Sequence, residues 1–270
     1  MSKGKAASRK LEGQTAWISG ATKGIGEGAA LLFAQAGARV AVIGRNVSDG
    51  RRVTRAITRK GGHAVFIQCD VAHEEEVRAS LEQTASIFGG LQILVNNAGI
   101  VDLRMLHDYT EEQWDHVMDV NVKSLFFAFK HAFPYLRKNK RSYVVNVGSI
   151  SSFVGQSGTP AYTASKGAVL QLSRSIALDY ARYGIRCNCV CPGITDTPML
   201  RQHLNATPDP AAHLAERLNR VPLTVALTPA DVAKSILYFC CEDSAGITGT
   251  SLIVDAGYLA AAEWDCSAVR

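Results

Sequence analysis

The sequence predicts a single α/β domain, a doubly wound parallel sheet with helices on both faces. Short and almost continuously apolar segments alternate along the chain with longer segments whose apolar residues recur at helical spacing. Strands that are apolar on both faces are typical of parallel sheets that helices cover on both sides. The 270 residues can bury one large core, and neither a linker nor an internal repeat divides them.

The predicted elements follow one another in a regular order. A first strand at 15–20 runs into a glycine-rich turn and a helix that ends near Gly37, and the remaining strands are expected at 39–44, 63–70, 91–99, 142–149, 185–193 and 251–257. Further helices are expected at 48–59, 74–89, 111–136, from 160 onwards and at 229–241. The stretch 196–223 is long, polar and interrupted by prolines, and we expect it to form a lid over a substrate site.

Positive charge is concentrated at the start of the chain. The formal net charge is +5. The first ten residues contain no acidic residue and four cations, which are Lys3, Lys5, Arg9 and Lys10. We therefore expect a disordered basic tail at 1–10 and a folded domain at 11–270. The tail lacks the apolar segment of a secretory signal and no later segment could span a membrane, so we expect a cytoplasmic protein. Neither a membrane nor nucleic acid is expected as a partner, although a short basic arm for nucleic acid or a weak targeting leader stays open.

Three of the seven cysteines alternate in RCNCVCPG, as Cys187, Cys189 and Cys191. Alternate residues of a strand share one face, so these thiols most simply fill a buried face of the sheet. Zinc is the less favoured alternative, because no histidine pair lies nearby at ligand spacing. We expect neither a metal nor a disulfide bond.

The turn after the first strand carries Gly20, Gly24 and Gly26, spaced as GxxxGxG. Glycines let the backbone turn tightly and approach a pyrophosphate, which then lies at the positive N-terminal end of the following helix. A turn that serves only close packing is the alternative. The position directly after the first strand favours a dinucleotide.

Polar residues also follow two later strands. Asp70 could meet the amino group of an adenine, or it could equally cap the next helix. The segment NNAG at 96–99 ends the following strand at the carboxyl edge, where ligands bind in open α/β sheets, although its asparagines could merely satisfy turn backbone.

Six motifs then occur in one order: SGATKGIG at 19–26, NNAG at 96–99, Asn121 in DVNVKS, Ser149 in VVNVGS, YxxxK at 162–166 and PGITDTPM at 192–199. By these motifs the chain resembles the short-chain dehydrogenase/reductase family, roughly over residues 10–258. Two departures are small. Ser19 replaces the usual threonine but keeps the hydroxyl, and Gly148 stands where a second serine is common. Among three neighbouring serines, Ser149 has the family's spacing of thirteen residues to the tyrosine.

The resemblance implies a Rossmann-like oxidoreductase that transfers a hydride between NAD(P) and an alcohol or carbonyl group. Tyr162 would donate or accept the proton, and Ser149 would hydrogen-bond the substrate oxygen. Asn121 would hold a water that passes protons to Lys166, although a mid-helix asparagine could otherwise merely kink the helix. A free phenol has a pKa of about 10, and Lys166 lies one helical turn from Tyr162, so we expect its charge to lower the tyrosine pKa.

The resemblance also implies the cofactor site. Pro192 and Gly193 would line the nicotinamide, and Ile194 and Thr197 would hold its carboxamide. The complete expected set is Gly20, Thr22, Lys23, Gly24, Ile25, Gly26, Arg45, Asn46, Asp70, Val71, Asn97, Ala98, Gly99, Tyr162, Lys166, Pro192, Gly193, Ile194 and Thr197.

The choice of dinucleotide depends on the end of the second strand. NAD-specific relatives usually carry an acid there, and this chain has Gly44 followed by Arg45. Lys23 lies within the glycine motif, so two cations could meet a 2′-phosphate, and we expect NADP(H) to be preferred over NAD(H). If Arg45 only packs on the adenine and Lys23 is solvated, the enzyme would accept NAD(H) or both cofactors. Asp49, the nearest acid, is expected to begin the next helix.

The sequence says less about the substrate. Gln156 and Asp102 lie near the expected pocket mouth and favour a hydroxylated molecule, such as a polyol or sugar, while a steroid or an acyl chain stays open. In the lid, Arg201, His203 and His213 could contact a polar substrate, but we expect them to face solvent.

A non-catalytic dinucleotide sensor or scaffold of the same fold is the alternative function. Loss of the tyrosine, the lysine or a glycine would favour it, and all of them are present. We also expect a homotetramer, because the helices at 111–136 and 162–182 carry more apolar surface than one sheet face covers. The family commonly pairs these helices across a two-fold axis, and SLIVDAGY would support a second contact.

Overall fold

A computed structural model describes residues 9–261 of the chain. Seven parallel strands form one central sheet in the order β3-β2-β1-β4-β5-β6-β7. This confirms the doubly wound, single-domain fold predicted from the sequence. Most of the expected basic tail lies outside the described residues, whereas its last two residues contact the folded body. Arg9 pairs with Glu12 at 3.1 Å, and Lys10 pairs with Asp243.

Each strand and helix expected from the sequence is present. The strands are β1 (Thr15–Ile18), β2 (Arg39–Gly44), β3 (His63–Gln68), β4 (Ile93–Asn96), β5 (Ser142–Val147), β6 (Ile185–Pro192) and β7 (Ser251–Val254). The helices are α1 (Gly24–Gln35), α2 (Val47–Thr58), α3 (Glu74–Phe88), α4 (Glu111–Met118), α5 (Ser124–Leu136), α6 (Pro160–Tyr180), α7 (Pro198–Asn205), α8 (Pro210–Asn219) and α9 (Pro229–Phe239).

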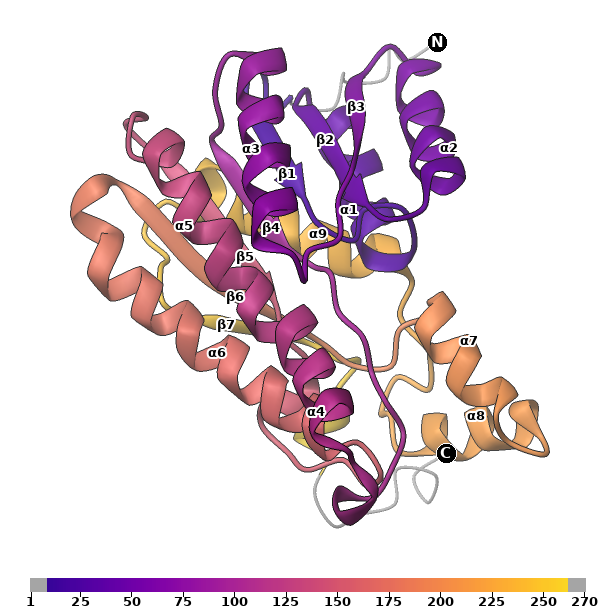
Figure 1. Ribbon diagram of the computed structural model, residues 1–270. Helices are drawn as coiled ribbons and strands as arrows, with labels where there is room; N and C mark the ends of the chain where they lie inside the picture. Colours follow the sequence, from indigo (N-terminus) through magenta and orange to yellow (C-terminus); the bar gives the residue numbers. More distant parts are fainter. Residues whose placement is uncertain (1–8, 262–270) are drawn as a thin grey trace, which may run out of the picture.

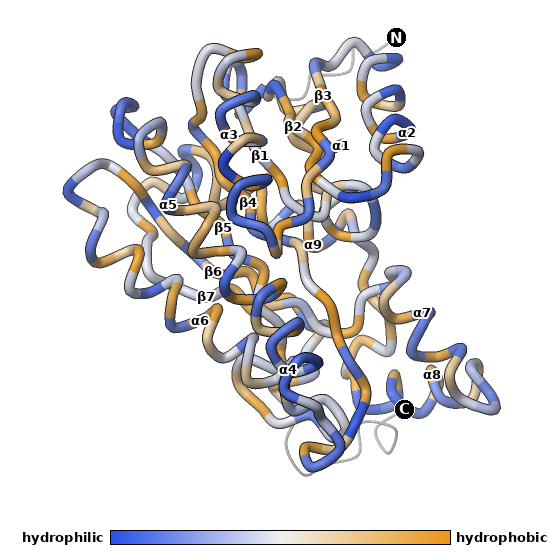
Figure 2. Tube along the Cα trace, viewed as in Figure 1, coloured by the Kyte–Doolittle hydropathy of each residue, from blue (hydrophilic) through white to orange (hydrophobic). Residues whose placement is uncertain are grey.

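The sheet lies between two layers of helices (Figure 1). On one face α1, α2 and α9 pack in a core that includes Ile18 and Phe33, and on the other α3, α5 and α6 pack in a core that includes Trp17 and Leu81. Neighbouring strand residues thus enter opposite cores, which is why the strands read as continuous apolar runs. Figure 2 shows the apolar residues concentrated along these strands.

The alternating cysteines of β6 share one buried face, as predicted. Cys187 belongs to the core under α3, α5 and α6, and Cys189 and Cys191 pack beside it on Leu125 and Val169. The six cysteines of the described residues are free thiols. Within 9–261, no group of histidine, cysteine and acidic side chains is arranged to hold a metal ion.

The helix expected at 111–136 is interrupted. A π-helical turn, Asp119–Lys123, joins α4 to α5 and carries Asn121, which is completely buried. Such turns insert one extra residue into a helix and often occur at functional sites. None of the helices between residues 9 and 261 is long and apolar enough to cross a membrane.

The strand order reverses between β1 and β4, and the chain leaves these two strands in opposite directions. A crevice at the carboxyl ends of the strands is the usual consequence of such a reversal. The predicted lid forms α7 and α8, which project beside this edge of the sheet (Figure 1).

Candidate active site

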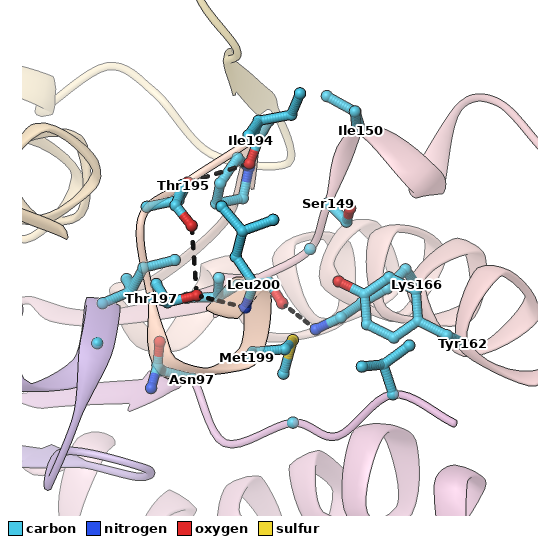
Figure 3. A pocket seen from close by; sticks show the side chains of 18 of the residues that line it. Asn97, Ser149, Ile150, Tyr162, Lys166, Ile194, Thr195, Thr197, Met199 and Leu200 are labelled. Carbon is cyan, nitrogen blue, oxygen red and sulfur yellow. Dashed lines mark hydrogen bonds between the residues drawn. The ribbon is translucent and has the colours of Figure 1, made fainter. Parts of the chain in front are cut away.

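A cavity of about 320 Å³ lies at the carboxyl edge of the sheet, below α7. Figure 3 shows Ser149, Tyr162 and Lys166 on one side of it and Thr195, Thr197 and Leu200 on the other. The predicted residues that line it are Gly20, Lys23, Gly24, Ile25, Asn97, Ala98, Gly99, Ser149, Tyr162, Lys166, Pro192, Gly193, Ile194 and Thr197. One cavity therefore joins three of the four predicted catalytic residues to most of the predicted cofactor residues.

The other predicted site residues do not line this cavity: Thr22, Gly26, Arg45, Asn46, Asp70, Val71 and Asn121. Two of them lie side by side at the ends of β2 and β3, where Arg45 Nη1 is 3.5 Å from Asp70 Oδ2. Asn46 caps α2, because its Oδ1 accepts a hydrogen bond from the backbone N–H of Asp49 at 2.9 Å. These residues continue the same edge of the sheet beyond the cavity.

The glycine turn is shaped by contacts that only glycine permits. Gly20 and Gly24 have φ angles of +61° and +55°, and a Cβ on Gly26 would lie 2.3 Å from the carbonyl oxygen of Gly20. The turn leads directly into α1, whose N-cap residue, Lys23, makes no side-chain capping bond. The first backbone N–H groups of α1 are therefore available to an anion.

Ser19 holds this turn against β4, a role that the sequence did not reveal. Its Oγ accepts hydrogen bonds from the backbone N–H groups of Asn97 at 3.0 Å and Ala98 at 3.1 Å. In return, Asn97 Nδ2 donates to the carbonyls of Ser19 at 3.0 Å and Gly20 at 3.2 Å. These bonds show why a hydroxyl is needed at Ser19, whether serine or threonine supplies it.

The catalytic candidates converge from β5 and α6. Helix α6 begins with Pro160 at its first position, which places Tyr162 and Lys166 one turn apart on the cavity side (Figure 3). Lys166 is 5% exposed, and its Nζ donates to the carbonyl of Val147 at 2.8 Å. The same Nζ lies 5.6 Å from the centroid of the Tyr162 ring. Ser149 follows β5, and its Oγ accepts from the backbone N–H of Ser151 at 3.1 Å.

The expected lowering of the tyrosine pKa is wrong for this structure. Burial raises the pKa of Tyr162 above its ordinary value, and the neighbouring Ser149 hydroxyl opposes this only in part. Burial also lowers the pKa of Lys166 to about 8. The expectation weighed only the attraction between two charges, whereas desolvation disfavours the charged form of each group and is the larger effect here.

The side chain of Asn121 is fully engaged as a donor. Its Nδ2 donates to the carbonyl of Ile100 at 2.8 Å and to Ser165 Oγ at 3.0 Å, and its Oδ1 accepts from the N–H of Ile100 at 2.8 Å. A Cβ on Gly99 would lie 3.4 Å from Asn121 Oδ1 and 3.5 Å from Lys166 Nζ. Asn121 thus fixes the loop after β4 in the immediate surroundings of the lysine.

The cavity is also lined by residues that the sequence did not single out as ligands. They are Val101, Val147, Gly148, Ile150, Thr195, Pro198, Met199, Leu200 and Arg217, and Gln156 lies with them as expected. His203 also lines the cavity, which corrects the expectation that it faces solvent. Its spacing to Leu200 and Leu204, which are buried on the inner side of α7, was a signal in the sequence for this position.

Three further substrate candidates lie elsewhere. Asp102 Oδ2 binds Arg104 at 2.9 Å and does not line the cavity, although its neighbour Val101 does. Arg201 is exposed and binds Asp196 at 2.9 Å. His213 also lies outside the cavity, 3.9 Å from Glu216.

Comparison with known proteins gives a consistent result. The family described as Enoyl-(Acyl carrier protein) reductase matches residues 20–259. An uncharacterized oxidoreductase of Thermotoga maritima is 37% identical, covering 92% of this chain and 98% of the relative. The 2-(R)-hydroxypropyl-CoM dehydrogenase of Xanthobacter autotrophicus is 36% identical, covering 92% of this chain and 99% of the relative. A solved dehydrogenase/reductase of Sinorhizobium meliloti superposes with a TM-score of 0.86 at 32% identity, covering 93% of this chain and 97% of that one.

Proposed function

Because the chain belongs to the short-chain dehydrogenase/reductase family, and is thus an NAD(P)-dependent oxidoreductase, we propose that the cavity below α7 is its active site. One observation carries this proposal: Ser149, Tyr162 and Lys166 meet in the cavity that the glycine turn also lines. No observation favours the non-catalytic alternative, which would not require a buried lysine beside a tyrosine.

The dinucleotide, when bound, supplies or accepts the hydride, and the chain supplies the rest. Tyr162 gives its hydroxyl proton to the substrate oxygen during reduction and takes it back during oxidation. Ser149 holds the same oxygen by a hydrogen bond as charge builds on it. Lys166 lies beside the tyrosine ring, where its positive charge opposes part of the cost that burial places on a phenolate.

Asn121 acts as a positioning residue in this scheme. Since both hydrogens of its side-chain amide are used by Ile100 and Ser165, the side chain has no donor left for a water. By holding Ile100 and Ser165 it fixes the loop after β4 against α6, in which Ser165 directly precedes Lys166. The expected proton relay through a water bound to Asn121 stays a prediction.

The glycine turn fits a dinucleotide. Backbone N–H groups at the start of α1 would bind the pyrophosphate, and the missing Cβ atoms of Gly20, Gly24 and Gly26 leave room for close approach. Pro192, Gly193, Ile194 and Thr197 would border the nicotinamide beside Tyr162. Asp70 and Val71 would lie at the adenine, with Asn46 near its ribose.

We propose that NADP(H) is preferred, with Arg45 and Lys23 as ligands of the 2′-phosphate. Arg45 pairs with Asp70 at 3.5 Å, and Lys23 pairs with Asp49 at 3.0 Å. Both cations are more than half exposed, so these pairs are worth at most about 1 kcal/mol each and can be exchanged for a phosphate. Gly44 packs closely against a side chain, since a Cβ there would lie 2.7 Å from Thr22 Cγ2. An acid at this position would therefore not fit without movement of Thr22.

The cofactor proposal is tested by the ratio of the kcat/KM value for NADPH to the kcat/KM value for NADH, which lacks the 2′-phosphate. We expect the wild type to prefer NADPH by roughly 30- to 150-fold, the effect of one charge-assisted interaction of about 2 to 3 kcal/mol. Arg45→Leu should remove most of this preference, and the exposed Arg51→Leu on α2 should leave it unchanged. A wild type that prefers NADH would overturn the assignment.

We propose a small secondary alcohol or the corresponding carbonyl as substrate. The substrate end is bordered by apolar side chains, among them Val101, Ile150 and Met199, and Gln156 is a polar group that could bind a hydroxyl. With Asp102 outside the cavity, Gln156 is the remaining support for a polyol or sugar. This class is tested directly by assaying a panel of alcohols and ketones, with turnover measured from the absorbance of the nicotinamide. If no compound of the panel is turned over, the proposed class is wrong.

A further inference from the structure

Two basic side chains from α7 and α8 line the cavity. His203 comes from α7 and Arg217 from α8, the two helices that pack together beside the carboxyl edge. His203 is half-buried, and its Nε2 is buried without a hydrogen-bond partner among residues 9–261. Buried polar nitrogens are normally paired, so an unpaired one that borders a cavity points to a ligand.

Arg217 is also without an acidic partner. Within the described part of the chain, no carboxylate oxygen lies within 4.0 Å of its guanidinium. The side chain is half-buried, and burial lowers its pKa, which indicates that water solvates the charge poorly. Leaving a guanidinium in such a place is unfavourable unless an anion binds it.

The other arginines of the lid make different contacts. Arg201 makes two hydrogen bonds of 2.9 Å to Asp196, and Arg220 lies over the ring of Tyr258 at 5.4 Å. Neither lines the cavity. Among the described residues that line the cavity there is no aspartate or glutamate. The cavity wall therefore offers Arg217 no opposite charge.

We propose that Arg217 and His203 bind an anionic group of the substrate, so that the enzyme acts on alcohols or carbonyl compounds that carry a carboxylate or a similar oxyanion. This inference rests on the proposed function and names the substrate class of the same site. The planar guanidinium binds both oxygens of a carboxylate, and the His203 Nε2 can donate a further hydrogen bond. Closure of α7 and α8 over the anion would place the hydroxyl end at Ser149 and Tyr162.

The kinetic test compares matched pairs of secondary alcohols. Each of 4-hydroxypentanoate, 5-hydroxyhexanoate and 6-hydroxyheptanoate is set against its primary amide, which has the same shape and no charge. We expect kcat/KM for the best carboxylate to exceed that of its amide by about tenfold or more, the effect of a charge-assisted hydrogen bond. Arg217→Gln should abolish this preference and Arg217→Lys should restore part of it, while Arg220→Gln, an exposed arginine at the end of the same helix, should leave it unchanged.

A binding measurement separates this inference from the proposed chemistry. Calorimetry with the Tyr162→Phe variant and NADP⁺ measures the affinity of each carboxylate and amide without turnover. Tighter binding of the anion, lost in the Tyr162→Phe/Arg217→Gln variant, supports the inference. Equal binding of both, or binding of neither, overturns it. If the amides and the carboxylates are turned over with equal kcat/KM, the inference fails while the proposed function stands. If Tyr162→Phe retains full turnover, the proposed function itself fails.

Discussion

Lys166 is a charged residue in a place that disfavours charge. It is 5% exposed, and burial lowers its pKa from 10.5 to about 8. Between these two pH values the unfolded chain keeps a proton on this lysine that the folded chain has lost. The unfolded state therefore binds more protons in this pH window. Below pH 8 the buried charge of Lys166 lowers the free energy of unfolding by its full amount, and this destabilisation decreases as the pH rises towards 10.5.

We predict that this destabilisation is measurable as a pH-dependent difference in the free energy of unfolding between the wild type and the Lys166→Met variant. From pH 7 to pH 10 the free energy of unfolding of the wild type should rise by roughly 2 to 3 kcal/mol relative to that of Lys166→Met, as follows from the shift in pKa. Urea denaturation at a series of pH values measures it. Lys60→Met, which removes an exposed lysine, should show no such trend, and a flat difference for Lys166→Met would show that the lysine is not desolvated.

Residue types and their spacing were sufficient to predict that Ser149, Tyr162 and Lys166 would come together, and all three line one cavity. The sequence could not show the balance between attraction and desolvation, because the burial of a side chain depends on residues far away along the chain. For the same reason it could not place His203 and Arg217 in one cavity: that requires α7 to pack against α8, and the contact between two short helices leaves little trace in the sequence.

The turn between β1 and α1 depends on close backbone contacts. A Cβ on Gly26 would lie 2.3 Å from the Gly20 carbonyl oxygen and 2.4 Å from Asn97 Nδ2. We predict that Gly26→Ala weakens NADPH binding by at least about tenfold, because the turn must open and its N–H groups then lose their alignment. Fluorescence titration of NADPH measures the change in Kd.

Gly167→Ala is the matched control for this prediction. Gly167 lies in α6 beside Lys166, and no atom of residues 9–261 lies within 4 Å of a Cβ at this position. The substitution should leave NADPH affinity unchanged and increase helix stability by up to about 1 kcal/mol. Equal NADPH affinity in the Gly26→Ala protein would mean that the turn does not bind the cofactor.

Elements were predicted well where periodicity is strong and less well where a local irregularity matters. The strands and most helices were identified by apolar spacing, whereas the π-helical turn at Asp119–Lys123 was not, because one extra residue hardly changes the pattern of a long helix. Gly148, a departure from the family, has a packing reason, since a Cβ there would lie 2.9 Å from the sulfur atoms of both Cys189 and Cys191.

At the scale of the whole molecule, α5 and α6 pack against each other and each carries a large exposed apolar side chain. The two helices are in contact, with the rings of Phe129 and Tyr180 4.5 Å apart. Phe126 on α5 is 52% exposed and Leu178 on α6 is 81% exposed. Large exposed apolar side chains on neighbouring helices are typical of subunit interfaces.

We predict a homotetramer that uses this surface. Light scattering should give about four times the chain mass of 29.0 kDa, and Leu178→Glu should lower the measured mass by placing charge in the interface. Thr58→Glu, an exposed position of α2 on the opposite face of the sheet, should not change it. A wild type that stays monomeric would refute the prediction.

The central claim is that Tyr162 is the acid–base group of a nicotinamide-dependent oxidoreductase. Its most direct test is turnover and cofactor affinity measured together for Tyr162→Phe, with Tyr180→Phe as a control in the same helix. We predict that turnover of Tyr162→Phe falls by at least about 100-fold, the scale of losing a general acid, while the Kd for NADPH stays close to the wild-type value. Turnover close to that of the wild type would contradict the claim, because the proton would then come from another group.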